Sequence, residues 1–234
     1  MRWVWDATRR FPKRPHYELS ELNDECERVV RDFLVERHGT ATYPCSTNDL
    51  TVLLEREAAD LDLFADLSGE GTAVEGVTYF EPGKKPRVAI SADLSNDPRR
   101  ENRLRTTLTH EFGHVHFHNF LWTVEAPTLA LFDDAPRVVQ AKCNRDSILH
   151  AGAVDWMEWQ AAYVCGAVLM PARAVRVLVP SSIVSRPESP DSSAGATLIA
   201  KVQARFLVSA DAARVRLIKL GYLTPSQNEV PLLG

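Results

Sequence analysis

The sequence predicts an α+β fold that is mostly helical and contains a small antiparallel sheet. Apolar residues recur with helical spacing in several separate stretches. Residues that favour strands occur together in one short region, residues 76–94, and Gly and Pro mark the turns between the predicted elements. With 234 residues and 45% hydrophobic content, the chain is long enough to bury a full core.

The first expected helix covers residues 20–39, in SELNDECERVVRDFLVERHG, and ends at Gly39. A second helix is expected after Ser46, through TNDLTVLLEREAADL at residues 47–61. The region GVTYFEPGKKPRVAISADL at residues 76–94 then predicts two strands joined by a turn that contains Pro and Gly. The sheet is therefore expected to lie just before a histidine-rich stretch.

Helical spacing returns from Pro98 to His118, whereas residues 119–154 have mixed polarity and no clear period. Another helix is expected at about residues 155–170, where Pro171 stops it. Near the end of the chain, ATLIAKVQARFLVSADAARVRLIKLGYL predicts two short helices. They meet at Val208 and Ser209, and Gly221 caps the second.

These expectations divide the chain into four parts. They are a basic and aromatic leader at residues 1–19, a main domain at residues 20–180, a Ser- and Pro-rich loop at residues 181–194, and a C-terminal helical segment at residues 195–234.

Composition excludes several classes of protein. The net charge of −4 gives no general attraction to nucleic acid or acidic lipid, so any such role needs a local basic face. The four cysteines form no CxxC pair, which argues against a disulfide framework and a zinc ribbon. The first 17 residues lack the apolar core of a signal peptide, and no apolar run is long enough to span a membrane. We expect a cytoplasmic protein with reduced thiols.

The stretch TLTHEFGHVHFH, residues 107–118, contains the pattern HExxH at His110, Glu111 and His114. Residues four apart lie on one face of a helix, so both imidazoles can reach one metal ion, with the glutamate beside them. A metal ion there would favour ionisation of water while the glutamate accepts the proton, which is the chemistry of peptide-bond hydrolysis.

HExxH also occurs by chance on exposed polar helices, so its surroundings matter. Gly113 lies inside the expected helix at a cost of about 1 kcal/mol relative to Ala, which suggests close approach by another element. Apolar Leu108, Phe112 and Val115 surround the motif, which indicates a buried helix. Buried His and Glu side chains need partners.

The other two histidines of the stretch are not expected to be ligands. His118 is separated from His110 by roughly 12 Å of helix rise, too far to share one ion, so we expect it beside the ligands instead. His116 points to another side of the helix and is expected at the surface or the edge of the core. The longer HExxHxxGxxH pattern is absent, because Phe117 and Phe120 occupy its fixed positions.

A catalytic zinc site needs a third protein ligand and an open position. Glu158, in DWMEWQAAYVCGAVLMP, is the leading candidate, because small residues on its helix allow a neighbouring helix to approach closely. His150, Asp155 and Cys143 are alternatives, and a solvated carboxylate near a helix start would explain Glu158 without a metal. Periodicity alone leaves this choice open.

Three motifs in order resemble the ImmA/IrrE family of metallopeptidases, the domain of unknown function 955. They are TLTHEFGHVHFH, EWQAAYVCGAVLMP and FLVSADAARVRLIKLGYL, and the resemblance extends from about residue 20 onward. It implies a zincin-like core, a gluzincin-like zinc endopeptidase, and one Zn²⁺, or another divalent ion, held by His110, His114 and Glu158. It also implies that Glu111 is the general base. Ala162 departs from the Asn usual in the family.

The resemblance further implies the cleavage of a helix-turn-helix transcriptional repressor, in a mobile element or a stress response. An alternative is a DNA-binding or partner-binding regulator with a structural or vestigial metal site. That alternative rests on the size of the C-terminal helix pair and its basic residues Lys201, Arg205, Arg214, Arg216 and Lys219. Arg214 and Arg216 also fit the solvated outer face of a packed domain, which is the commoner reason for such charge.

Overall fold

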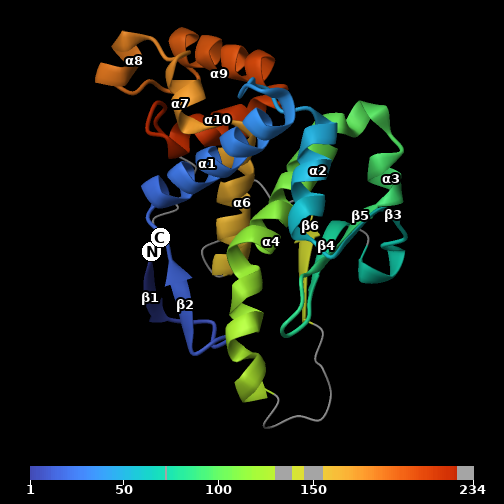
Figure 1. Cartoon of the computed structure of the whole chain (residues 1–234). Helices are drawn as coiled ribbons and strands as arrows, with labels where there is room; N and C mark the ends of the chain where they lie inside the picture. The colour runs from blue at the N-terminus through green and yellow to red at the C-terminus, as the bar shows by residue number, and fades with distance from the viewer. Residues whose placement is uncertain (72, 130–138, 145–154, 226–234) are drawn as a thin grey trace. The chain divides into compact units, whose positions relative to one another are not determined.

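The computed structural model describes residues 1–71, 73–129, 139–144 and 155–225. Figure 1 shows the helices and strands of the chain, coloured by residue number. Contacts divide the chain into two compact units, neither of which is continuous in sequence. Unit 1 comprises Met1–Pro44, Gly152–Trp156 and Gly166–Gly234, and unit 2 comprises Cys45–Ala151 and Met157–Cys165. One helix, α6 (Trp156–Leu169), supplies residues to both units. The fold is mixed α+β, as predicted.

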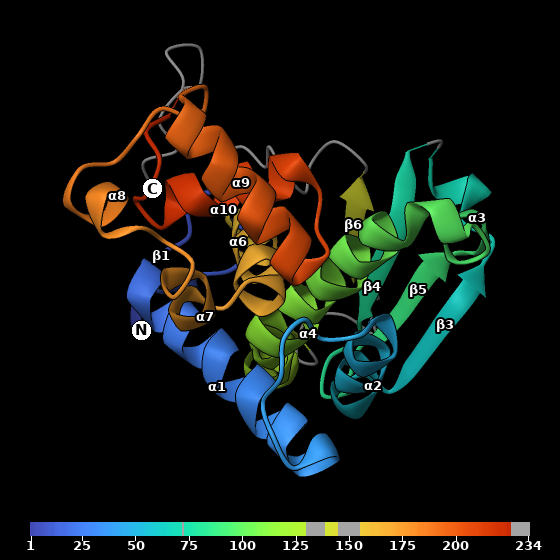
Figure 2. The ribbon, with the colours of Figure 1, turned by 90° about the horizontal axis from the view of Figure 1, so that it is seen from above.

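Unit 2 contains a four-stranded mixed sheet, whose strands lie side by side in Figure 2. Their order is β3 (Asp60–Ala65), β5 (Arg87–Ser91), β4 (Val74–Phe80) and β6 (Val139–Asn144). The predicted antiparallel pair is confirmed as β4 and β5. The sheet is nevertheless larger than predicted, because β6 adds antiparallel to β4 and β3 adds parallel to β5.

Strand β3 corrects the second predicted helix. Helix α2 (Thr47–Glu57) begins after Ser46 as expected, and the Ser46 hydroxyl caps it by accepting from the Asp49 N–H at 3.0 Å. It ends four residues early, however, because the chain turns to pair with a distant strand. The Ala59 N–H donates to the Pro86 carbonyl at 2.8 Å, and exposure then alternates along β3.

The histidine-rich helix is longer than predicted. A 3₁₀ turn, η2 (Pro98–Arg100), leads into α4 (Glu101–Leu129), which continues through Pro127 instead of ending near His118. Its packing explains part of this extension, since Trp122 stacks on Phe80 of β4 with 3.9 Å between ring centroids. A short helix, α3 (Ala92–Ser95), and a 3₁₀ turn, η1 (Ser68–Glu70), complete the regular structure described in unit 2.

The two faces of the sheet have different neighbours. Gly76 and Thr78 of β4 face α4, and Glu111 of that helix lies against both. The other face carries a small apolar cluster that contains Val77 and Ala89, with Leu67 packed against them. The alternation of β4 therefore presents one side of the strand to the histidine helix.

Unit 1 begins with a hairpin that the sequence did not predict in residues 1–19. Its strands are β1 (Arg2–Trp5) and β2 (Lys13–His16), which pair antiparallel. Helix α1 (Leu19–His38) follows, with Gly39 in the left-handed region at φ 76°, as expected of its terminating glycine. The strand propensity of the leader was masked by its many basic residues.

The C-terminal part of unit 1 is helical. It contains α7 (Ala172–Arg176), α8 (Ser181–Ser185), α9 (Ser193–Phe206) and α10 (Ala210–Lys219). The two predicted C-terminal helices are confirmed, and α8 shows that the segment 181–194 is not wholly a loop. Ser209 caps α10 by accepting from the Ala212 N–H at 3.1 Å, and Gly221 has a φ of 76°. None of the described helices combines the length and apolarity needed to cross a bilayer.

The expectation that Arg216 lies on an outer face is wrong. Its side chain is buried, and its Nε donates to the Met170 carbonyl at 3.0 Å while its Nη2 donates to the Asn23 side-chain oxygen at 2.8 Å. A buried guanidinium needs such acceptors, so this arginine links α10 to α1 and to the residue that follows α6 inside unit 1.

Candidate metal centre

Helices α4 and α6 bring His110, His114 and Glu158 together within unit 2. The Nε2 atoms of the two histidines are 3.1 Å apart. Glu158 places Oε2 at 3.2 Å from His110 Nε2 and Oε1 at 3.2 Å from His114 Nε2. One ligand atom from each residue lies within 4.8 Å of the others, so this group could hold a metal ion.

The helices approach closely because of a glycine. A Cβ on Gly113 would lie 2.9 Å from the Cα of Ala161, which is closer than real Cβ contacts allow. This confirms that Gly113 marks a close approach and that small residues on the Glu158 helix receive it. Glu158 lies three residues before Ala161, on the same side of α6, so the contact holds its carboxylate beside the histidines.

The spacing of the three groups fits a single ion. Ligand atoms about 2.0–2.1 Å from a tetrahedral ion lie roughly 3.3–3.4 Å apart, close to the separations of 3.1 and 3.2 Å between these donors. Two imidazole nitrogens and one carboxylate also form a donor set well suited to zinc. The chain could supply this set and leave the remaining coordination position open.

The surroundings of Glu158 favour its anionic form. Both histidines are fully buried, and the Glu158 side chain is 18% exposed. Burial alone would raise the pKa of Glu158, but the neighbouring His114 and His110 outweigh it and hold the pKa well below the ordinary value. Glu158 is therefore an anion that faces two imidazoles, which is a favourable arrangement for a cation.

Glu111 lies between the two histidines in sequence and is fully buried. The Thr78 hydroxyl donates a hydrogen bond to its Oε2. A Cβ on Gly76 would lie 2.5 Å from Glu111 Oε1, so only glycine leaves room for the carboxylate against β4. Sequence reasoning missed both residues, although an isolated glycine inside a strand pattern is a signal of close approach.

No protein-family model matches this chain, and no curated protein sequence matches it either. The site therefore rests on its own geometry. The resemblance to the ImmA/IrrE family remains a prediction from the three motifs.

His118 lies beside the ligand set. Its Nδ1 is 3.1 Å from His114 Nδ1, and its Nε2 is 3.1 Å from the side-chain oxygen of Gln160 on α6. Burial, together with the nearby His114, holds the pKa of His118 well below its usual value, so the ring is neutral. It contacts a ligand without belonging to the group of three, which fits its expected place.

The remaining sequence candidates have other surroundings. His116 is partly exposed and lies 2.8 Å from the Glu57 carboxylate of α2, away from the three ligands. Asp155 forms an ion pair with Arg10 at 2.8 Å inside unit 1. His150 and the side chain of Cys143 lie outside the described residues.

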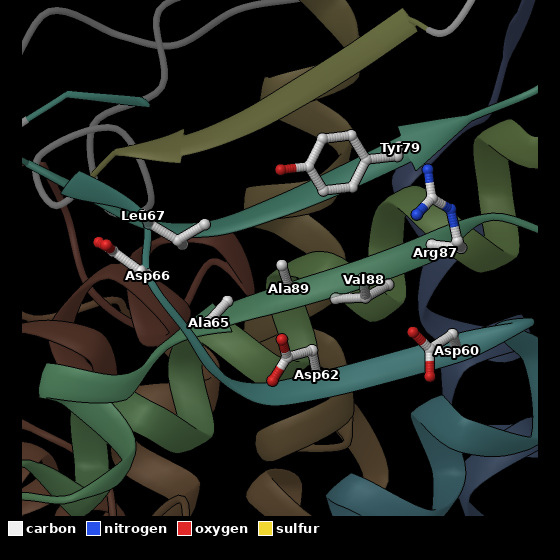
Figure 3. Close-up of a pocket in the computed structure, with 9 residues that line it drawn as sticks. All are labelled: Asp60, Asp62, Ala65, Asp66, Leu67, Tyr79, Arg87, Val88 and Ala89. Carbon is white, nitrogen blue, oxygen red and sulfur yellow. The ribbon is translucent and has the colours of Figure 1, made fainter. Parts of the chain in front are cut away.

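A pocket of about 450 Å³ lies on the face of the sheet opposite Glu111 (Figure 3). Tyr79, Arg87 and Ala89 form part of its wall, and Asp60 and Asp62 project beside it from β3. None of the three ligand residues lines this pocket. It is therefore a separate feature from the metal centre.

Proposed function

We propose that the protein is a zinc-dependent endopeptidase. The observation that supports this most strongly is the convergence of His110, His114 and Glu158 beside a buried glutamate from the same helix. A structural zinc site would more often close its fourth position with another Cys or His. An additional carboxylate held beside the ligands is instead what hydrolysis requires.

In this proposal His110, His114 and Glu158 hold the ion. When bound, zinc supplies Lewis acidity, which favours ionisation of water and polarises a carbonyl group. Glu111 accepts the proton of the attacking water and passes it to the leaving amine. Thr78 orients the Glu111 carboxylate through its hydrogen bond, and Gly76 gives that carboxylate its place against β4.

The proposed substrate is a helix-turn-helix transcriptional repressor. This part of the proposal rests on the resemblance to the ImmA/IrrE family. The test is to co-express the chain with the product of the neighbouring gene and to look for a single cut. Wild type should cut, and Glu111→Gln should keep its metal but not cut. Loss of metal in Glu111→Gln would point to a ligand role and contradict the assignment of the base.

Glu57→Gln is a matched control for that experiment. It removes a carboxylate from a histidine contact in the same unit, with His116, without touching the three ligands. Cleavage should be unchanged in Glu57→Gln. A cut that persists in Glu111→Gln would contradict the proposed role of Glu111 as the base.

The alternative of a DNA-binding regulator has less support than the sequence suggested. Arg216 is buried, whereas Lys201 and Arg205 are exposed on α9, and Arg205 donates to the Tyr43 carbonyl. Binding of duplex DNA that weakens steeply with salt would favour this alternative. Absence of binding at low salt would remove it.

A further inference from the structure

The N-terminal hairpin of unit 1 carries an exposed aromatic surface that the proposed peptidase does not use. Strand pairing places Trp3 opposite Pro15 and Trp5 opposite Lys13, so these four residues share one side of the hairpin. We call them the tryptophan face. Trp5 is 78% exposed and Trp3 is 46% exposed. Tryptophan, which combines a large apolar ring with a polar N–H group, is enriched at binding interfaces.

The hairpin is also strongly cationic, in contrast to the negative chain as a whole. Residues 1–16 contain five basic side chains and one acidic one. The basic residues are Arg2, Arg9, Arg10, Lys13 and Arg14. The single carboxylate, that of Asp6, is buried and accepts hydrogen bonds from Thr8 and Phe11. It holds the loop in place, and the five basic side chains outnumber it.

Only part of this positive charge is paired. Arg10 contacts Asp155 at 2.8 Å, and Arg2 lies 3.8 Å from Glu18. Arg9 and Lys13 form no ion pair with any described residue. The ammonium of Lys13 lies 5.5 Å from the centre of the Trp5 ring, so one cation and one aromatic surface are presented together.

This combination matches the chemistry of single-stranded nucleic acid. Side chains two residues apart on a strand project on the same side and are spaced by roughly 7 Å, which allows successive unpaired bases to stack on the two rings. Lysine beside a ring, and lysine or arginine elsewhere on the hairpin, can bind the phosphates. We infer that the tryptophan face binds single-stranded RNA or DNA, with bases on Trp5 and Trp3 and phosphates on Lys13 and Arg9.

Two other partners share some of this chemistry. A duplex offers phosphates but hides the faces of its bases, so it cannot use the tryptophans. An anionic membrane surface accepts both Trp and Lys at its interface. The lysine beside the exposed Trp5 ring, with a second tryptophan two residues away on the same strand, favours the single strand. The membrane surface is tested as a separate arm of the experiment.

The experiment uses the full chain and fluorescein-labelled oligo(dT) and oligo(U) of about 16 nucleotides, measured by fluorescence anisotropy at several salt concentrations. Both oligomers should bind. Trp5→Ala should weaken binding by about 5- to 150-fold, because the loss of one base-stacking contact costs about 1–3 kcal/mol. Trp5→Phe should retain most of the affinity, because its aromatic ring can still stack on a base. Lys13→Gln should reduce the slope of log affinity against log salt by about 0.7.

Phe64→Ala is the matched control, since Phe64 is also an exposed aromatic, in unit 2, and is 63% accessible. Its affinity should equal that of wild type, and circular dichroism should show all variants folded. Three results would overturn the inference: no binding at low salt, equal binding of a duplex with no effect of Trp5→Ala, or binding only to phosphatidylserine vesicles.

Discussion

The Nδ1 atom of His114 lies 3.1 Å from the Nδ1 atom of His118. Both rings are buried, and His118 is neutral, so the hydrogen bond needs one donor and one acceptor. The amide oxygen of Gln160 can only accept, which places the His118 proton on Nε2. His118 Nδ1 then accepts from His114 Nδ1, and the lone pair of His114 remains on Nε2, toward Glu158.

His118→Phe should therefore weaken metal binding without removing a ligand. The variant keeps a ring of similar size but loses the acceptor for His114 Nδ1–H, and such partners typically contribute 10- to 100-fold in metal affinity. Competition with a chromophoric chelator measures the change. His116→Phe is the control and should bind as wild type does; an equal loss in both variants would make the effect one of packing.

Gly76→Ala should abolish cleavage while metal content stays near that of wild type. The new methyl group would lie 2.5 Å from Glu111 Oε1, so the carboxylate must move from its place beside Thr78. We expect a stability cost of about 1–3 kcal/mol, measured by denaturant unfolding. Gly69→Ala is the control, because nothing lies within 4 Å of its added Cβ. Undiminished cleavage by Gly76→Ala would remove Glu111 from the mechanism.

Gly113→Ala should lower both stability and metal content. Its Cβ would meet the backbone of Ala161, which cannot yield as a side chain can, so α4 and the Glu158 segment of α6 must separate. Destabilisation of about 1–3 kcal/mol is expected. Metal content by mass spectrometry and the denaturation midpoint measure the two effects, again with Gly69→Ala as the control. A destabilised variant with full metal content would show that Glu158 is not held by this contact.

Glu158→Ala should sharply reduce zinc content, and chelation should lower the melting temperature of wild type. A ligand that binds only the folded state stabilises it, and added zinc should restore the wild-type midpoint. Glu158→Ala should melt at the same temperature with and without chelator. Unchanged zinc stoichiometry in this variant would exclude Glu158 as a ligand.

Asp6→Asn should make unit 1 less sensitive to acid. Burial would raise the pKa of Asp6, but hydrogen bonds from Thr8 and Phe11 outweigh it and lower the pKa below its ordinary value. The resulting stabilisation is present above the ordinary pKa near 4 and disappears as pH falls through the lowered folded value. The denaturation midpoint of Asp6→Asn should lie below that of wild type at pH 7, and the two midpoints should converge at pH 3. The exposed control Asp24→Asn should have the wild-type midpoint at both pH values.

Sequence reasoning reached the parts of the site that local spacing determines. The HExxH pair follows from helical periodicity, and Gly113 indicated a close neighbour before its identity was known. The selection of Glu158 over Asp155 required the fold, because both are carboxylates near the start of one helix. Only Glu158 lies beside the histidines, whereas Asp155 pairs with Arg10.

The missed features depend on contacts between distant segments. The first two residues of β3, Asp60 and Leu61, were predicted as the end of a helix, but hydrogen bonds to β5 make them part of a strand. No sequence motif marks Thr78 or Gln160. They contact Glu111 and His118 only because β4 and α6 pack beside α4. Local propensity carries no signal for such partners.

The interleaving of the two compact units has a consequence for how the protein is made. Unit 2 is incomplete until Cys165 has been synthesised, and unit 1 needs both ends of the chain. His110 and His114 are therefore synthesised before the segment that carries Glu158. The candidate metal-binding group therefore assembles late, and truncation at either end of the chain removes part of unit 1.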